Sequence, residues 1–230
     1  MQTLGIFVKQ PVAGRVKSRL AKGLGEAAAL RVYTAFLDDL LLRFRRVADR
    51  RALGYTPATS EAAAEFYQRG GENYELWPQP DVGLGKRMQC FFAEHLRNED
   101  DRAVLIGSDS PTLPVAYVEQ AFAALEHADC VLGPATDGGY YLIGQKGHVW
   151  PIFEGIEWSQ SRVLEQTVVR LESAGARLAL LPPWYDVDTL DDYQLLRGHL
   201  RALQLAGTAD EFPATRQVIE SLSMEPAREE

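Results

Sequence analysis

Basic side chains are concentrated near the start of the chain, in the segment FVKQPVAGRVKSRLAKGLG (7–25). The chain has a formal net charge of −8, yet residues 1–25 contain no acidic residue. Backbone N–H groups ahead of a helix, together with Lys and Arg side chains, are well suited to hold phosphate oxygens. Gly14 would allow a tight turn there, and Pro11 would restrict the loop before a ligand binds. The segment therefore predicts a phosphate-binding loop formed by Lys9, Gly14, Arg15, Lys17 and Arg19. The alternative is a basic turn whose charges pair with nearby acidic residues.

Two aspartates follow apolar segments that are typical of buried strands. Asp109 lies in RAVLIGSDSPTLP (102–114), and Asp188 lies in WYDVDTLDDY (184–193) after the apolar run RLALLP. Carboxylates from two strand ends could together bind one Mg²⁺ or Mn²⁺ ion that also coordinates phosphates. The alternative for Asp109 is a turn or a cap of the helix expected after it. Asp191 and Asp192 fall in the first turn of a helix, where negative charge is favourable, so we assign them a structural role.

The segment PDVGLGKRM (80–88) has two glycines between an expected strand and an expected helix. Gly83 and Gly85 would allow the backbone to approach a nucleotide closely. A plain strand-to-helix connection explains the same glycines equally well. The segment GLGEAA (23–28) matches a dinucleotide-binding G-x-G-x-x-A pattern, but no strand precedes it directly, so it does not indicate an NAD site.

A second glycine-rich segment, GPATDGGYYLIG (133–144), lies between two expected strands. Its Asp-Gly pair is a strong signal for a hairpin turn. The alternative is an acceptor-binding loop, because the second strand is followed by no evident pairing partner. In that case Tyr140 and Tyr141 would offer a ring face and a hydroxyl to the acceptor.

Strand-like and helical patterns alternate along almost the whole chain. The expected strands are residues 3–8, 50–56, 74–79, 102–108, 129–135, 139–145 and 177–184, and the expected helices are 25–47, 60–69, 85–96, 114–128, 159–175 and 190–204. This alternation predicts a single doubly wound α/β fold, with a mostly parallel sheet and helices on both faces. Such sheets bind ligands at the carboxyl ends of their strands, near the point where strand order reverses. The loops that follow strands are therefore the expected site.

The overall composition indicates an ordinary globular protein with one domain, residues 1–205, and an acidic C-terminal tail or helix, residues 206–230. The acidic balance argues against a nucleic-acid-binding surface. No run of 18 apolar residues predicts a membrane span, and the N-terminus lacks the pattern of a signal peptide. The two cysteines, Cys90 and Cys130, have no metal-ligand spacing and suit a reducing compartment. We therefore expect a cytoplasmic location; the oligomeric state is not indicated.

Five motifs occur in an order that resembles a known family. They are K-x-P-x-x-G-x-x-K-[ST]-R-L (9–20), G-x-D-x-P-x-L (107–113), D-G-G-Y-Y-L-I-G (137–144), I-x-W-S (156–159) and D-x-D-T (186–189). Over roughly residues 3–200 the chain resembles a bacterial family of GT-A-like glycosyltransferases, long known as a domain of unknown function. This family falls within the nucleotide-diphospho-sugar transferase superfamily. The chain is also similar to phospholactate guanylyltransferases, whose basic first loop is built in the same way.

The resemblance implies a nucleotide-binding α/β fold with a metal-binding aspartate after the fourth strand. Asp109 would take the metal position and Asp188 a second one, while the first loop would contact phosphates. We expect the catalytic residues to be Asp109, Lys17 and Asp137. The expected nucleotide-binding residues are those of the first loop with Gly83 and Gly85, and the expected acceptor-binding residues are Asp137, Gly138, Gly139, Tyr140 and Trp158. The chain departs from the usual GT-A pattern, because Ser-Asp-Ser (108–110) stands where Asp-x-Asp is common.

The sequence leaves three functions open. A metal-dependent glycosyltransferase would use a nucleotide sugar and an unidentified acceptor, and the family resemblance favours it. A nucleotidyltransferase would use a nucleoside triphosphate and release pyrophosphate, whose spread charge needs several cations, and the basic first loop favours it. A non-catalytic nucleotide-binding protein would account for the missing second acid of the metal motif. We place sugar-nucleotide transfer first.

Overall fold

The computed structural model describes residues 1–207 and 211–224, and the chain divides into two compact units. The first unit comprises Met1–Gln10, Phe44–Gly107 and Leu113–Asp186, and the second is built from residues 11–43, 108–112 and the part of the chain after Asp186. The chain passes into the second unit at the carboxyl ends of two neighbouring parallel strands, after Gln10 and after Gly107. No helix among the described residues combines the length and apolar character needed to cross a membrane.

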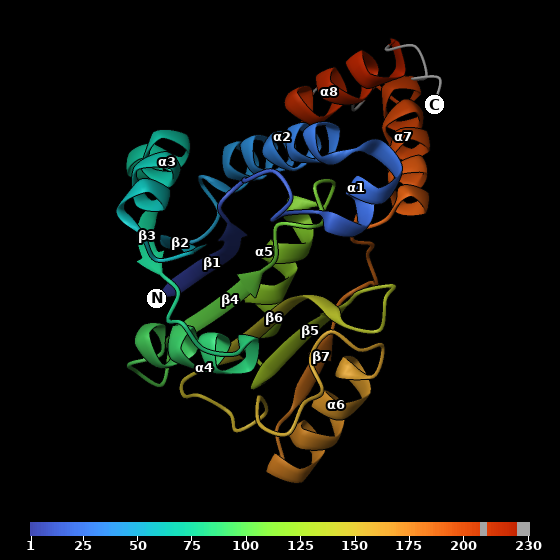
Figure 1. The fold of residues 1–230 in the computed structure, drawn as a ribbon. Helices are drawn as coiled ribbons and strands as arrows, with labels where there is room; N and C mark the ends of the chain where they lie inside the picture. Colours follow the sequence, from blue (N-terminus) through green and yellow to red (C-terminus); the bar gives the residue numbers. More distant parts are fainter. Residues whose placement is uncertain (208–210, 225–230) are drawn as a thin grey trace. The chain divides into compact units, whose positions relative to one another are not determined.

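The first unit is built on one seven-stranded sheet with the order β3-β2-β1-β4-β6-β5-β7 (Figure 1). Its strands are β1 (Gln2–Lys9), β2 (Arg50–Thr56), β3 (Glu75–Pro78), β4 (Arg102–Ile106), β5 (Cys130–Pro134), β6 (Tyr140–Lys146) and β7 (Leu178–Leu180). The strand β6 runs antiparallel to its neighbours β4 and β5, and the other neighbouring pairs of this sheet are parallel. The doubly wound, mostly parallel α/β fold expected from the sequence is confirmed.

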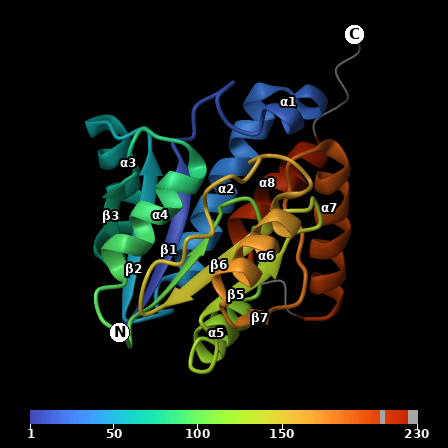
Figure 2. The ribbon, with the colours of Figure 1, turned by 90° about the horizontal axis from the view of Figure 1, so that it is seen from below.

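Helices of the first unit cover both faces of this sheet. They are α3 (Ser60–Gly70), α4 (Leu84–His95), α5 (Val115–Ala124) and α6 (Val163–Ala174), with a short 3-10 helix η1 (Gly71–Asn73). The helices α4 and α6 share one face of the sheet (Figure 2). Phe91 of α4 and Leu171 of α6 belong to one buried cluster with Leu105 of β4. The helix α3 packs Phe66 against Tyr55 of β2, while α5 contacts β4, β5 and β6. Successive residues of a strand point to opposite faces of the sheet. Because helices cover both faces, strands such as β4 are apolar at successive positions.

The second unit is helical. It contains α1 (Ser18–Leu24), α2 (Glu26–Phe44) up to Arg43, α7 (Leu190–Leu205) and α8 (Pro213–Met224). Helix α1 lies against the start of α7, where Gly23 leaves room for Leu190. The guanidinium of Arg43 on α2 stacks 4.3 Å from the ring centroid of Phe212, just before α8.

Several element boundaries differ from the expected ones. The basic segment was expected to run as a loop into one helix at residue 25. Instead, the short helix α1 precedes α2, and Gly25, with a φ of 82°, is the C-cap residue that ends it. Only Leu20 is buried in α1, so its sequence lacks the apolar stripe that reveals a helix. The strand expected over 177–184 is limited to Leu178–Leu180, because Pro182 and Pro183 lack the N–H that extends a ladder.

The Asp-Gly segment forms a hairpin turn. The strands β5 and β6 pair antiparallel on either side of it, with an irregularity between Gly133 and Pro134. The hairpin alternative is confirmed for this segment, and both pairing partners of β6, β4 and β5, precede it in the chain. Of the expected C-terminal tail or helix, α8 covers Pro213–Met224, while residues 208–210 and 225–230 lie outside the described residues. The domain boundary at residue 205 stays a prediction.

Candidate functional site

Lys17 is the buried centre of a polar group in the second unit. Its backbone adopts the left-handed conformation, with φ 50° and ψ 40°, immediately before α1. This conformation is disfavoured for a residue with a side chain, so the surrounding structure must hold it in place. The ammonium lies 5.8 Å from the ring centroids of both Tyr33 and Phe36 on α2. The first loop thus directs its one buried cation inward, onto the aromatic face of the following helix.

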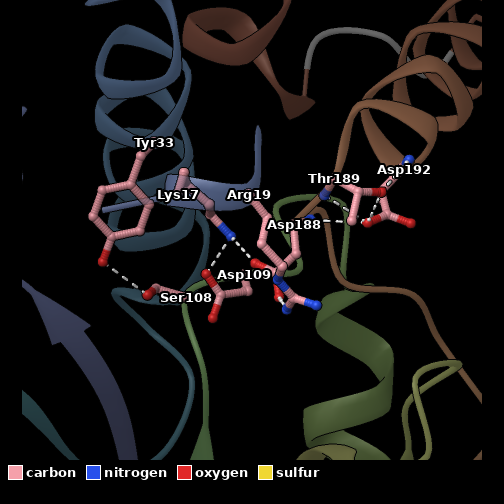
Figure 3. Close-up of polar contacts among 8 residues, drawn as sticks. All are labelled: Lys17, Arg19, Tyr33, Ser108, Asp109, Asp188, Thr189 and Asp192. Atoms are coloured by element: carbon pink, nitrogen blue, oxygen red, sulfur yellow. Dashed lines mark hydrogen bonds and ion pairs between the residues drawn. The ribbon is translucent and has the colours of Figure 1, made fainter. Parts of the chain in front are cut away.

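Two carboxylates converge on that ammonium (Figure 3). Lys17 Nζ donates to Oδ1 of Asp109 and, at 2.9 Å, to Oδ1 of Asp188. Arg19 donates from Nη2 to the other oxygen of Asp188 at 2.5 Å. The Lys17 side chain is 2% exposed, compared with 47% for Asp109 and 28% for Asp188. The acids predicted to bind metal and two cations of the predicted phosphate loop therefore form one cluster.

Asp188 is held by the start of α7. Thr189 caps this helix in a reciprocal arrangement, in which its hydroxyl accepts from the N–H of Asp192 and the Asp192 carboxylate accepts from the N–H of Thr189. The same carboxylate accepts from the N–H of Asp188 at 3.1 Å. The structural role expected for Asp192 is confirmed, and its effect is to fix the backbone of Asp188.

Asp109 is held by contacts on both sides of its loop. The N–H of Val187, next to Asp188, donates to the Asp109 carbonyl at 2.9 Å, which ties the two loops together. The hydroxyl of Ser108 lies 3.1 Å from that of Tyr33, and Arg43 donates to the carbonyl of Pro111 at 3.0 Å. The alternative of a helix cap is wrong, because α5 begins after Pro114 without a side-chain cap.

The charges of this cluster stabilise one another. Burial disfavours the charged form of Lys17, but the negative charges of Asp109 and Asp188 outweigh burial and raise the pKa of Lys17 above its ordinary value. Burial would raise the pKa of Asp188, but Lys17 and Arg19 outweigh it, and the pKa lies below its usual range. The ion pair between Lys17 and Asp188 therefore persists at neutral pH. The sequence left open that the basic segment is a turn whose charges pair with nearby acidic residues. Lys17 and Arg19 do form such pairs, and their partners are the two predicted metal ligands.

The remaining residues of the predicted phosphate loop are more exposed. Arg15 is exposed, and its N–H closes a turn onto the carbonyl of Val12 at 3.0 Å. Gly14 has a φ of 71°, and a Cβ there would lie 3.3 Å from the carboxylate of Glu26. This glycine is required by the turn itself. Lys9 is exposed at the end of β1 in the first unit.

The glycines of the 80–88 segment lie at the start of α4, in the first unit. Gly83 is the N-cap residue and has no side chain to cap the helix. A Cβ on Gly85 would lie 2.7 Å from Cζ2 of Trp158 and 2.8 Å from the carbonyl oxygen of Phe153. Close packing therefore accounts for Gly85. It also brings together two residues that the sequence assigned to separate nucleotide and acceptor sites.

Two neighbours of these glycines were not singled out from the sequence. Gln79 is buried where β1 and β2 end, and its amide donates to the carbonyl of Gly54 at 2.6 Å. Its side-chain oxygen accepts from Arg87 Nη1 at 3.3 Å, and Arg87 Nε donates to the carbonyl of Val82 at 2.6 Å. An amide at the last residue of an expected strand is the sequence signal that could have identified Gln79.

The hairpin residues lie at the start of α6. Asp137 Oδ1 accepts from the N–H of Gly139 at 2.9 Å. Gly138 has a φ of 91°, a Cβ there would lie 2.0 Å from the carbonyl oxygen of Ser161, and its carbonyl accepts from the N–H of Leu164 at 2.9 Å. The backbone of the turn is therefore fixed against the α6 start, and Asp137 stays exposed.

Tyr140 is partly buried in the first unit, and its hydroxyl is buried. Its ring packs against the cluster shared by α4 and α6. Burial raises the pKa of its hydroxyl, although the nearby Thr167 hydroxyl acts in the opposite direction. An acceptor could reach the exposed Asp137 more easily than the hydroxyl of Tyr140.

Comparison with known proteins gives the family. Residues 42–160 match the profile of a family described as "Uncharacterized protein conserved in bacteria (DUF2064)". A solved structure from Desulfovibrio desulfuricans G20, described as a "putative nucleotide-diphospho-sugar transferase", is 31% identical. The alignment covers 96% of this chain and 97% of that one, with a TM-score of 0.84. The chain belongs to the DUF2064 family. Its fold is that of the nucleotide-diphospho-sugar transferase superfamily.

More distant structures share the fold of this DUF2064 protein. A nucleotidyl transferase from Methanothermobacter thermautotroptrophicus is 16% identical, with a TM-score of 0.55 over 88% of this chain and 99% of that one. A 4-diphosphocytidyl-2C-methyl-D-erythritol synthase is 12% identical, with a TM-score of 0.52 over 85% of this chain and 96% of that one. No curated protein matches the sequence.

Proposed function

We propose that the protein is a metal-dependent transferase that uses a nucleotide-diphospho-sugar and transfers its glycosyl group to an acceptor. The observation that carries this proposal is the convergence of Asp109 and Asp188 on Lys17 of the basic first loop. The description of the Desulfovibrio relative supports the choice of a sugar nucleotide as substrate. The chain's own contribution is a set of paired opposite charges within the second unit.

The carboxylates of Asp109 and Asp188 suit Mg²⁺ or Mn²⁺. Both are oxygen donors on backbone that is hydrogen-bonded in place, and the pair already holds a cation, the Lys17 ammonium. Among the described residues no group of three or more His, Cys, Asp or Glu side chains could hold a metal. Two carboxylates with substrate phosphates and water are a common Mg²⁺ arrangement. A bound Mg²⁺ or Mn²⁺ would act as a Lewis acid that neutralises charge on the departing phosphate.

The basic residues would hold the phosphates of the nucleotide. Lys17 and Arg19 balance the charges of the two acids, and the more exposed Arg15 and Lys9 add positive charge to the loop. Gly14 shapes the turn that presents them. We further assign Gly83 and Gly85 to the nucleotide side. Gly85 has a second role, because packing against Trp158 requires a glycine at this position whether or not a nucleotide binds.

The hairpin and Trp158 would bind the acceptor. Asp137 uses Oδ1 to accept from Gly139, which leaves its other carboxylate oxygen to bind an acceptor hydroxyl and take its proton. In the transfer, the acceptor oxygen forms a bond to the anomeric carbon of the sugar. The bond from that carbon to the phosphate oxygen breaks, and the nucleoside diphosphate leaves with the electron pair. Gly138, Gly139 and Tyr140 would then shape the acceptor side.

Nucleotidyl transfer is a second candidate, favoured by one observation. Two cations, Lys17 and Arg19, lie beside the two acids, and a triphosphate, whose charge is spread over several oxygens, would use more than one cation. In that reaction the acceptor oxygen would bond to the α-phosphorus, and pyrophosphate would leave. Release of pyrophosphate from a nucleoside triphosphate would replace the first proposal by this one.

Thermal melting tests the proposal. Nucleoside triphosphates, nucleoside diphosphates and sugar nucleotides are added with Mg²⁺ or Mn²⁺ to the wild type, to Asp109→Asn and to Asp191→Asn. Asp191 is an exposed acid of the same α7 region that lies outside the cluster, so its variant is the matched control. We expect at least one nucleotide to raise the melting temperature of the wild type and of Asp191→Asn, and not that of Asp109→Asn. The proposal fails if no nucleotide stabilises the wild type with either metal.

A further inference from the structure

Lys17 occupies the space between the two proposed metal-binding carboxylates. Its ammonium contacts Oδ1 of both Asp109 and Asp188, and Arg19 contacts the remaining oxygen of Asp188 (Figure 3). The lysine is almost fully buried, whereas both acids are partly exposed. A metal ion that arrives from solvent would therefore meet carboxylates whose inner oxygens are already in use.

The formal charges of this cluster already cancel. Lys17 and Arg19 supply two positive charges, and Asp109 and Asp188 supply two negative charges. A divalent cation bound here alone would leave two uncompensated positive charges beside a buried ammonium, which is unfavourable at low local dielectric. Phosphates of a nucleotide would supply the missing negative charge. Metal and phosphate should thus bind more tightly together than either does alone.

We propose that Lys17 makes metal binding conditional on nucleotide binding. In the nucleotide-free protein its ammonium takes the place of the metal between the carboxylates, and in the loaded protein it turns to the phosphates. The inference deepens the proposed function and rests on it, since it takes the ligand to be a metal–phosphate complex. Lys17 is in this view a switch between two sets of anions, and the flexible four-carbon stem of lysine permits that movement.

Arg19 belongs to the same charge balance. Its side chain is 60% exposed and contacts the outer oxygen of Asp188, so its removal would also change the site. The matched control is Lys22→Met, because Lys22 is an exposed lysine in the last turn of α1 that lies outside the cluster. Removal of this exposed charge should change metal affinity far less than removal of the Lys17 charge.

The first experiment measures Mn²⁺ binding in the absence of any nucleotide, by calorimetry and by loss of the free-ion electron paramagnetic resonance signal. It compares the wild type with Lys17→Met and the control Lys22→Met. Methionine at position 17 keeps the length and the apolar stem beside Tyr33 and Phe36 but removes the charge. We expect Lys17→Met to bind Mn²⁺ at least tenfold more tightly than the wild type, and Lys22→Met to stay within about threefold. Equal affinity of Lys17→Met and the wild type would overturn the inference.

The second experiment uses the wild type alone and does not depend on the variant's folding. Melting is recorded with Mn²⁺, with pyrophosphate as a phosphate probe, and with both. We expect Mn²⁺ alone to change the melting temperature little, and the two together to raise it by more than the sum of the separate shifts. Strictly additive shifts, or a full shift with Mn²⁺ alone, would contradict the inference.

The two experiments separate failure of this inference from failure of the proposed function. In one outcome the wild type turns over a nucleotide substrate but binds Mn²⁺ equally well with and without phosphate. The proposed function then stands, and the inference that Lys17 makes metal binding conditional on nucleotide fails. A wild type that binds no nucleotide loses the proposed function, while the Mn²⁺ comparison between Lys17→Met and the wild type still reports on the competition between lysine and metal.

Discussion

A buried aspartate should determine whether α8 stays attached to α2. Asp39 on α2 is 1% exposed, and its two carboxylate oxygens accept from the N–H groups of Ala214 at 3.0 Å and Thr215 at 2.7 Å. These N–H groups belong to the first turn of α8, where a helix has no internal acceptors and favours a negative charge. Asp39 therefore caps a helix that lies about 175 residues further along the chain.

The magnitude follows from the two bonds. A hydrogen bond to a charged group contributes about 1.5–3 kcal/mol to stability. In Asp39→Ala both are lost, but detachment of α8 would return the N–H groups to water, so we expect a loss of about 3 kcal/mol rather than the full sum. Asp39→Asn can still accept one bond but turns an NH₂ group toward the other donor, and we expect a loss of about 2 kcal/mol.

Urea unfolding followed by circular dichroism measures this loss, and limited proteolysis reports release of α8. Asp81→Asn is the control, because it removes the same charge from an exposed position and should change stability by less than about 0.5 kcal/mol. If Asp39→Asn and Asp81→Asn unfold within about 0.5 kcal/mol of each other, the buried carboxylate is not what attaches α8.

Three further predictions concern stability. Gly85→Ala should destabilise the protein by about 1–3 kcal/mol, because its Cβ would meet Trp158 and the Phe153 carbonyl; unchanged urea unfolding would contradict this packing. Gly198→Ala should instead stabilise it by about 0.5–1 kcal/mol, since this exposed glycine lies inside α7 with open space around it; a lower melting temperature would be the opposite result. Burial would raise the pKa of Asp101, but hydrogen bonds from Arg97 and Asn98 outweigh it and lower the pKa. The carboxylate therefore stabilises the fold above its unfolded pKa of about 3.9, and this contribution is lost as the pH falls through the lower folded value. Asp101→Asn should cost about 1–3 kcal/mol at pH 7, with the difference from the wild type shrinking in acid; a difference that is constant with pH would refute the assignment.

The order of elements could be predicted because it depends on local pattern. The strand over residues 50–56 was predicted to the residue, since an apolar run there is bounded by polar ones. The candidate acids could also be predicted, because Asp109 and Asp188 each follow an apolar strand and such loops belong to one edge of a parallel sheet. Lys17 and Arg19 fall in the basic segment after the first strand, which is why cations and acids were expected to share a ligand.

The contacts themselves could not be predicted, because they join residues far apart in the chain. Nothing in the sequence shows that the side chain of Lys17 is buried while that of Arg19 is exposed. Each of the two has one apolar neighbour and shares Ser18 as the other, so the local pattern is the same for both. The packing of Gly85 on Trp158 depends on how α4 meets the loop before α6. The cap of α8 by Asp39 likewise depends on tertiary structure, so the sequence indicated only an acidic tail or helix.

The most direct test of the proposed function is to follow a nucleotide by ³¹P nuclear magnetic resonance. Sugar nucleotides and nucleoside triphosphates are incubated with Mg²⁺ and candidate acceptors, using the wild type, Asp109→Asn and the Asp191→Asn control. The account predicts that the wild type and Asp191→Asn convert a sugar nucleotide to free nucleoside diphosphate, and that Asp109→Asn does not. Equal turnover by Asp109→Asn, or a wild type that binds nucleotide with metal and leaves every phosphate resonance unchanged, would contradict it.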